Sequence, residues 1–370
     1  MLKWSVSLPL TLTLAACGQL TTVAPTASQT AQIAPPALLT PQGQTSIRNA
    51  DPSVLRVGST YYSVESDGNN IYTRAAGSVD ALAAAPRVLI WASAKNLPNV
   101  WAPEIVREPA DGRYYVYFAA GDGGGGQRMY VSSSASPGSG YGDPQRMALP
   151  DDRWAIDGTA FTFGGTRWFV WSGWAGTTNG EQNLYVARMN TPTSTTGARY
   201  IISQPREGWE QADPSPPTRV NEAPEPIVDP SGQLHIVYSA NGSWAANYCL
   251  ADLRLSSGGD PTNVWAWYKS NGCLFGSNGS LMMSGWDPTL NVNGPGHHSF
   301  VLLNGDVSTS PPSGSRFPLM FHAVPKSLNY TWGNRSWYSG TFMWWGNTAY
   351  TRGPGNGPTS NTGWSLKFFE

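Results

Sequence analysis

Short apolar runs separated by turn residues recur along the chain and predict β-hairpins. In the clearest case an Asp-Gly turn at 111–112 precedes the aromatic run 114–118, and strands rich in aromatic and β-branched residues beside such turns are typical of hairpins. Five segments follow this plan, each opening with an ionisable residue, and they begin at Asp51, Glu104, Asp157, Glu222 and His297. Two further runs, 128–131 and 183–188, predict additional strands.

This repeat predicts the fold class. The five starting residues lie 53 to 75 positions apart, and four strands in each segment correspond to the blade of a propeller. We therefore expect an all-β chain that forms a five-bladed β-propeller over residues 46–370. Because the innermost strands of a propeller run along a central channel, the opening residues are expected to meet there. The alternative is that they are solvent-facing strand ends that recur by chance.

Composition supports strands and turns rather than helices. The chain has 41 Gly, 30 Pro and 12% aromatic residues, and Gly and Pro break helices. Its 40% of hydrophobic residues suffice for a folded core. Since 24 acidic residues face 23 basic ones, no basic surface is available for a polyanion, and we exclude nucleic-acid binding.

The N-terminus has the pattern of an export signal. An apolar stretch follows Lys3 and ends in small residues before Cys17, which predicts a signal over residues 1–16. The cysteine is similar to the lipid-attachment residue of bacterial lipoproteins; an ordinary secretory signal with an incidental cysteine is the alternative. Residues 17–45 are expected to form a flexible linker.

Membrane contact is expected only through that lipid anchor. No later stretch is apolar for the roughly 18 residues that a membrane span needs. We therefore expect an exported protein that is either anchored in the bacterial cell envelope or secreted. We also expect it to be a monomer.

The remaining cysteines, Cys249 and Cys273, could form a disulfide or bind a metal ion. In an exported domain two cysteines favour a disulfide. A zinc site would need further ligands at short, fixed spacing. We expect the disulfide and assign it no chemistry.

Convergence of the opening residues would place three carboxylates in one channel. If Asp51, Asp157 and Glu222 meet, burial and like-charge repulsion raise at least one pKa. A protonated acid facing an ionised carboxylate can hydrolyse a glycosidic bond, because one protonates the leaving oxygen while the other activates water. The many aromatic residues suit stacking on sugars.

Other hydrolase and nucleotide-binding motifs are absent from the sequence. No Gly-x-Ser-x-Gly elbow and no His-Glu-x-x-His pair occurs among the 370 residues. The glycine-rich run 121–126 lacks the Lys-Ser/Thr of a phosphate-binding loop. We interpret this run as a flexible turn.

Several motifs, in order, carry a resemblance to glycoside hydrolase family 43. They are NVWAPEIV (99–106), YYVYFAAGDG (114–123), WAIDGTAF (154–161), FVWSGWAGTTNGEQNLYVA (169–187), NEAPEP (221–226), IVYSANGSW (236–244) and GPGHHSF (294–300). The resemblance covers about residues 50–325 and is strongest to the family's exo-acting α-L-arabinofuranosidases. It implies a five-bladed propeller.

The resemblance also implies roles for the three carboxylates. Asp51 matches the general base, Glu222 the general acid, and Asp157 the residue that orients the acid and tunes its pKa. The family inverts the anomeric configuration, which needs a base and acid about 6.5–9.5 Å apart. Glu225, three residues beyond Glu222, is the rival acid.

Other matches concern binding. Trp101 is expected to border the sugar, and Arg335 is the nearest candidate for a substrate-binding arginine, with an ordinary surface arginine as the alternative. His297 matches a channel histidine that holds an ion or a water network in relatives, so Ca²⁺ or Na⁺ could bind there, although no cofactor is required. His298 replaces the usual Asn, and Glu104 is expected to be structural.

Together these observations predict an inverting glycosidase. We expect it to release terminal α-L-arabinofuranosyl groups from arabinan or arabino-oligosaccharides. A β-D-xylosidase is the alternative within enzymes, since pentose preference depends on one or two hydroxyl contacts. A non-catalytic sugar-binding propeller is the alternative outside them.

Overall fold

Antiparallel hairpins between sequence neighbours dominate the computed structural model. It describes residue 43 and residues 45–92, 97–213, 219–286, 290–308, 311–352 and 360–370, which belong to one unit spanning Leu39–Glu370. The predicted export signal, Cys17 and nearly all of the predicted linker lie outside these residues. The prediction of an all-β chain is confirmed, because the helices of the described part are short 3₁₀ turns.

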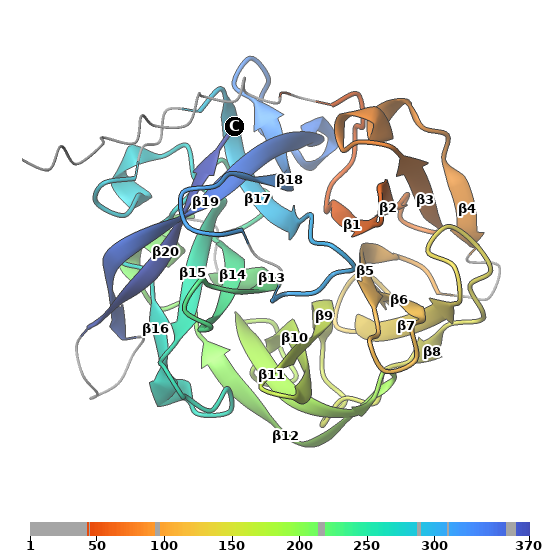
Figure 1. Ribbon diagram of the computed structural model, residues 1–370, viewed down its shortest axis with the longest axis horizontal. Helices are drawn as coiled ribbons and strands as arrows, with labels where there is room; N and C mark the ends of the chain where they lie inside the picture. Colours follow the sequence, from red (N-terminus) through yellow and green to blue (C-terminus); the bar gives the residue numbers. More distant parts are fainter. Residues whose placement is uncertain are drawn as a thin grey trace, which may run out of the picture. The chain divides into compact units, whose positions relative to one another are not determined.

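The strands fall into five consecutive sets of four, each an antiparallel meander (Figure 1). The first set is β1 (Ser53–Val57), β2 (Thr60–Ser66), β3 (Ile71–Ala76) and β4 (Val88–Trp91). The second is β5 (Trp101–Arg107), β6 (Tyr114–Ala120), β7 (Arg128–Ser134) and β8 (Gln145–Arg146). The third is β9 (Ala155–Phe163), β10 (Thr166–Trp174), β11 (Glu181–Thr191) and β12 (Ser194–Ser203). The fourth is β13 (Arg219–Val228), β14 (Leu234–Ala240), β15 (Cys249–Leu255) and β16 (Trp267–Lys269). The fifth is β17 (Val292–Phe300), β18 (Phe317–Pro325), β19 (Ser336–Arg352) and β20 (Asn361–Phe369). The 3₁₀ helices are η1 (Asp80–Ala84), η2 (Gly208–Gln211), η3 (Val264–Ala266), η4 (Gly279–Leu281) and η5 (Trp332–Asn334).

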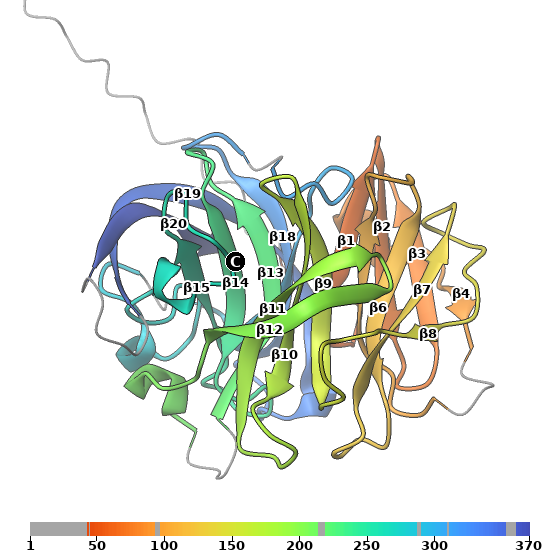
Figure 2. The same ribbon diagram turned by 90° about the horizontal axis from the view of Figure 1, so that it is seen from below.

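The first strand of each set lies nearest the middle of the unit (Figure 1), and Figure 2 shows several of these strands from the side. They contact one another in the order β1, β5, β9, β13, β17, and β17 also contacts β1. Hydrogen bonds also join the third and fourth sets, through parallel β11 and β13, and the fourth and fifth, through β16 and β19. Side chains at equivalent points of the first strands are thereby brought together.

A left-handed residue recurs at one point of every set. The residues concerned have φ between 40° and 53°, and they are Asp51, Ala102, Asp157, Ala223 and His297. In the last four sets the pairing with the second strand shifts at this residue. Such a bulge re-aims the neighbouring side chains, and non-Gly residues adopt this conformation only where the surroundings enforce it.

These bulges correct the predicted alignment of the repeat. The residues equivalent to Asp51, Asp157 and His297 are Ala102 and Ala223, not Glu104 and Glu222. Sequence patterns place strands but do not reveal where an extra residue enters a strand. The alignment was therefore displaced by two positions in the second set and by one in the fourth.

Apolar side chains fill the space between neighbouring sets. Tyr117 of β6 and Phe169 of β10 lie with ring centroids 5.3 Å apart, joining the second and third sets. Val54 of β1 shares a buried cluster with Trp337 of β19. The fifth set therefore packs against the first, although the two are far apart in sequence.

Two sequence predictions concern the fourth and fifth sets. The expected disulfide between Cys249 and Cys273 is confirmed. The sequence favours a core position over a rim position for the pair Trp344 and Trp345; Trp344 is buried in the core, whereas Trp345 is 46% exposed. Across the described ranges, no helix has both the length and the apolar character needed to cross a membrane.

Candidate active site

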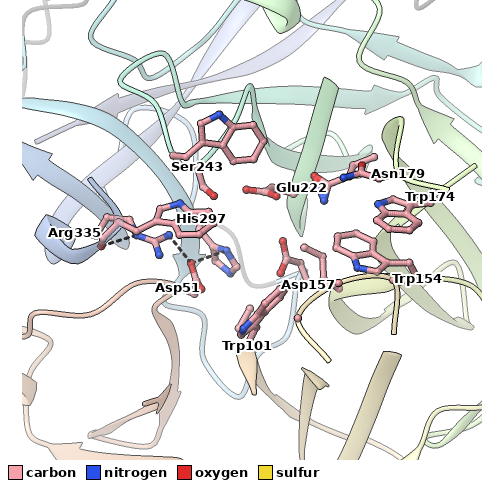
Figure 3. A pocket seen from close by; sticks show the side chains of 18 residues that line it. Asp51, Trp101, Trp154, Asp157, Trp174, Asn179, Glu222, Ser243, His297 and Arg335 are labelled. Atoms are coloured by element: carbon pink, nitrogen blue, oxygen red, sulfur yellow. Dashed lines mark hydrogen bonds and ion pairs between the residues drawn. The ribbon is translucent and has the colours of Figure 1, made fainter. Parts of the chain in front are cut away.

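A cavity of about 580 Å³ opens where the first strands meet (Figure 3). It brings together all six predicted site residues, which are Asp51, Trp101, Asp157, Glu222, His297 and Arg335. The left-handed backbone at Asp51, Asp157 and His297, and beside Glu222, aims these side chains inward. Four of the five residues that open the predicted repeats therefore meet in one cavity, whereas the fifth, Glu104, does not line it.

Two histidine rings and an arginine guanidinium surround Asp51. Its Oδ1 lies 3.1 Å from His297 Nδ1, 3.2 Å from His322 Nδ1 and 3.9 Å from Arg335 Nη1. Burial opposes ionisation, but the positive charges of His297 and Arg335 hold the pKa of Asp51 well below its usual range. Asp51 is therefore a carboxylate at neutral pH, as a general base must be.

His322 completes the surroundings of Asp51. The backbone N–H of Asp51 donates to His322 Nδ1 over 3.1 Å. Burial lowers the pKa of His322 to about 4, so the ring is neutral and can accept this bond. The sequence analysis did not single out His322, which lies on β18, the second strand of its set.

Glu222 has the opposite character. Its carboxyl is buried near Asp157, and burial together with the Asp157 charge raises the pKa of Glu222 to about 8. Burial also raises the pKa of Asp157, to about 6, and its Oδ2 accepts a hydrogen bond from the Ala223 N–H at 3.0 Å. One cavity thus holds an ionised carboxylate and a carboxylic acid that stays protonated at neutral pH.

His297 lies between two carboxylates. Its Nδ1 faces Asp51, and its Nε2 lies 3.4 Å from Glu104 Oε1. Burial lowers the pKa of His297, but Asp51, Asp157 and Glu104 outweigh it and raise the pKa to about 10. The ring is therefore an imidazolium with both nitrogens directed at acids.

This geometry does not fit an ion bound through the His297 ring. A metal ligand needs a free ring nitrogen, and both nitrogens face carboxylate oxygens. Within the described ranges, no three His, Cys, Asp or Glu side chains are grouped so that they could hold a metal ion. No step proposed below depends on an ion.

Glu225, the rival acid, does not line the cavity. It lies next to Glu104, and burial and the Glu104 charge raise its pKa well above the usual value. His298 also points elsewhere: its ring contacts Phe300 edge-on at 4.7 Å and has no hydrogen-bond partner in the described part of the chain. Geometry thus favours Glu222 over Glu225 as the acid.

A buried network supports the strand that carries Glu222. Asn221 donates from Nδ2 to Glu210 Oε1 over 2.8 Å, and Lys269 Nζ lies 2.9 Å from both Glu210 oxygens. The Tyr238 hydroxyl donates to the same carboxylate at 2.8 Å. Glu210 belongs to η2, outside the repeated hairpins, so the repeat gave no signal for it.

Further cavity-lining residues were not singled out from sequence. They include three glycines of the glycine-rich run, which form part of the wall rather than only a turn, and several aromatic and polar residues: Gly123, Gly124, Gly125, Trp154, Trp174, Asn179, Gln182, Ser243, Trp244 and Trp332. Most lie at strand ends or in loops rather than at the start of a first strand. Two signals were available: the nearness of Trp154 to Asp157 in the sequence, and the motifs 169–187 and 236–244, which contain Trp174, Asn179, Gln182, Ser243 and Trp244.

Comparisons with known proteins identify the family of the chain. The sequence profile described as Glycosyl hydrolases family 43 matches residues 45–309. An extracellular exo-α-(1→5)-L-arabinofuranosidase of Streptomyces avermitilis is 32% identical over 69% of this chain and 52% of its own length. α-L-Arabinofuranosidase 43 of Humicola insolens is 28% identical over 71% of this chain and 53% of its own length. The chain thus spans about half the length of these relatives.

A solved structure is similar in fold. An α-L-arabinofuranosidase from Lactobacillus brevis superposes with a TM-score of 0.67 at 24% identity, over 84% of this chain and 95% of the other. The profile match covers the acidic residues of the cavity, the first four strand sets and β17 of the fifth set. The chain therefore belongs to glycoside hydrolase family 43.

Proposed function

We propose that this protein is an inverting α-L-arabinofuranosidase that removes terminal arabinofuranosyl groups from arabinan or arabino-oligosaccharides. The observation that carries the proposal is the pairing of an ionised Asp51 with a protonated Glu222 in one cavity. The choice of arabinofuranosides is supported by the named activities of the relatives.

The reaction is a single displacement. Glu222 donates its proton to the glycosidic oxygen while the bond between that oxygen and C1 breaks. Water attacks C1 from the opposite face, and Asp51 accepts a proton from it, so the product forms with inverted configuration. Asp157 keeps Glu222 protonated between turnovers, and His297 and Arg335 keep Asp51 ionised. Trp101 borders the sugar.

We propose that the five sets are the blades of a closed propeller. The cyclic contacts of the first strands and the packing of Val54 against the Trp337 cluster support closure. Export is supported by the relative named as extracellular. Lipid attachment at Cys17 and a monomeric state remain predictions; a labelled palmitate incorporated into the wild type but not into Cys17→Ala would support the anchor.

The test uses Asp51→Asn and Glu222→Gln with an aryl α-L-arabinofuranoside whose leaving group needs a proton. Both variants should lose at least about a hundredfold in kcat, and wild-type-like rates in either would refute the roles. A parallel assay on the aryl β-D-xyloside decides between the two pentoses, and proton NMR of the first product decides inversion. Sugar binding without product release would favour a non-catalytic propeller.

A further inference from the structure

Two buried polar atoms beside the cavity have no hydrogen-bond partner. They are Nε1 of Trp174, a residue 7% exposed, and Oε1 of Gln182, a residue 6% exposed. Both residues line the cavity. An indole N–H can only donate and an amide oxygen can only accept, and buried atoms of either kind nearly always have partners.

The two atoms belong to one cross-strand pair. Trp174 ends β10 and lies directly opposite Gln182 of β11. The Trp174 ring stacks on that of Trp154, with centroids 4.9 Å apart and an angle of 8° between the planes. An aromatic face and a donor–acceptor pair thus occur together, as in sites that hold a sugar ring by stacking and by its hydroxyls.

This pair lies on the acid's side of the cavity. Gln182 pairs with Val220 of β13, two residues before Glu222. Asp51 is held instead by His297, His322 and Arg335. In Figure 3 Trp154 and Trp174 lie beyond Glu222 and Asp157, across the cavity from Asp51.

The geometry of a single displacement determines which sugar lies on each side of the cavity. Water attacks from the side of the base, and the departing sugar leaves on the side of the acid. A group next to the acid and away from the base therefore meets the departing sugar rather than the sugar whose bond is cleaved at C1.

We infer that Trp174 and Gln182 form the binding site for the departing sugar. Trp174 Nε1–H donates to one hydroxyl of this sugar and Gln182 Oε1 accepts from another, while the sugar ring lies against the Trp154–Trp174 stack. This inference rests on the proposed function. It makes both residues specificity determinants for the chain that is shortened, with no part in proton transfer.

The experiment compares substrates with and without a departing sugar. The variants are Trp174→Phe, which keeps an aromatic ring and removes the N–H, and Gln182→Met, which keeps the length and removes the acceptor. Gln145→Met on the exposed strand β8 is the matched control. The substrates are α-1,5-arabinobiose and α-L-arabinofuranosyl fluoride, whose leaving group is a single atom, and thermal unfolding checks that each variant is folded.

The inference predicts that kcat/KM for arabinobiose falls about tenfold in each variant, mainly through KM, while kcat/KM for the fluoride stays within about twofold of the wild type. Equal losses on both substrates would assign the pair to the terminal sugar and overturn the inference, as would unchanged rates on both. If the wild-type protein cleaves neither substrate, the proposed function itself fails. If the wild-type protein is active but the variants lose the same rate on both substrates, only the inference about Trp174 and Gln182 fails.

Discussion

At the scale of single residues, the site depends on two carboxyl groups held in opposite protonation states. Asp51 is surrounded by His297, His322 and Arg335, whereas Glu222 is buried beside another acid. The proposed mechanism requires Asp51 ionised and Glu222 protonated, so it predicts that kcat/KM falls on the alkaline side as Glu222 loses its proton near pH 8.

Asp157→Asn tests this pH dependence. Removing the Asp157 charge lowers the pKa of Glu222, so the alkaline limb of the kcat/KM profile should move to lower pH. The asparagine oxygen can still accept the Ala223 N–H, so the backbone contact is kept. Asp260→Asn, on the surface, is the control and should leave the limb in place. An alkaline limb that stays or moves upward in Asp157→Asn contradicts the account.

At the scale of strands and helices, a buried charge pair supports the strand that carries Glu222. Glu210→Gln leaves the Lys269 ammonium buried without its counter-charge, which should lower the free energy of unfolding by about 3–5 kcal/mol. The matched control is Glu181→Gln, whose partner Arg206 is half-exposed, with an expected loss of less than about 1 kcal/mol. Urea unfolding measures the loss of stability in both variants. Equal losses in Glu210→Gln and Glu181→Gln would rule out a dominant role for the Glu210–Lys269 pair.

The strands could be predicted from the sequence, whereas the bulges and the contacts between elements could not. Hairpins are local, so alternating aromatic runs and turns such as that before Tyr114 were enough to place the strands. The bulges at Ala102 and Ala223 were not predictable, because a left-handed alanine has no sequence signal. Asp51 and Asp157 open their sets and Glu222 lies one residue before the equivalent Ala223, so the repeat was enough to bring all three into the predicted site. Gln182 and Glu210 were missed because their positions depend on pairings between elements.

At the scale of the whole molecule, one tryptophan links the two ends of the described unit. Trp337 of the fifth set is fully buried against the first set, and its Nε1 donates to the carbonyl of Ala50, next to Asp51, over 2.8 Å. Trp337→Ala should lower the free energy of unfolding by about 3–5 kcal/mol and also reduce kcat. Trp345→Ala, at an exposed site, should cost less than about 1 kcal/mol. Similar losses in both variants would argue against the predicted closure.

The central claim is that Glu222 protonates the leaving oxygen while Asp51 activates water, and leaving-group dependence tests it most directly. kcat/KM should be measured for Glu222→Gln and Asp51→Asn on arabinobiose and on 2,4-dinitrophenyl α-L-arabinofuranoside, whose leaving group needs no proton. The account predicts that Glu222→Gln loses about 10²–10⁴-fold on arabinobiose but far less on the activated substrate, while Asp51→Asn loses similarly on both. Equal losses on the two substrates in Glu222→Gln, or a fully active Asp51→Asn, would contradict it.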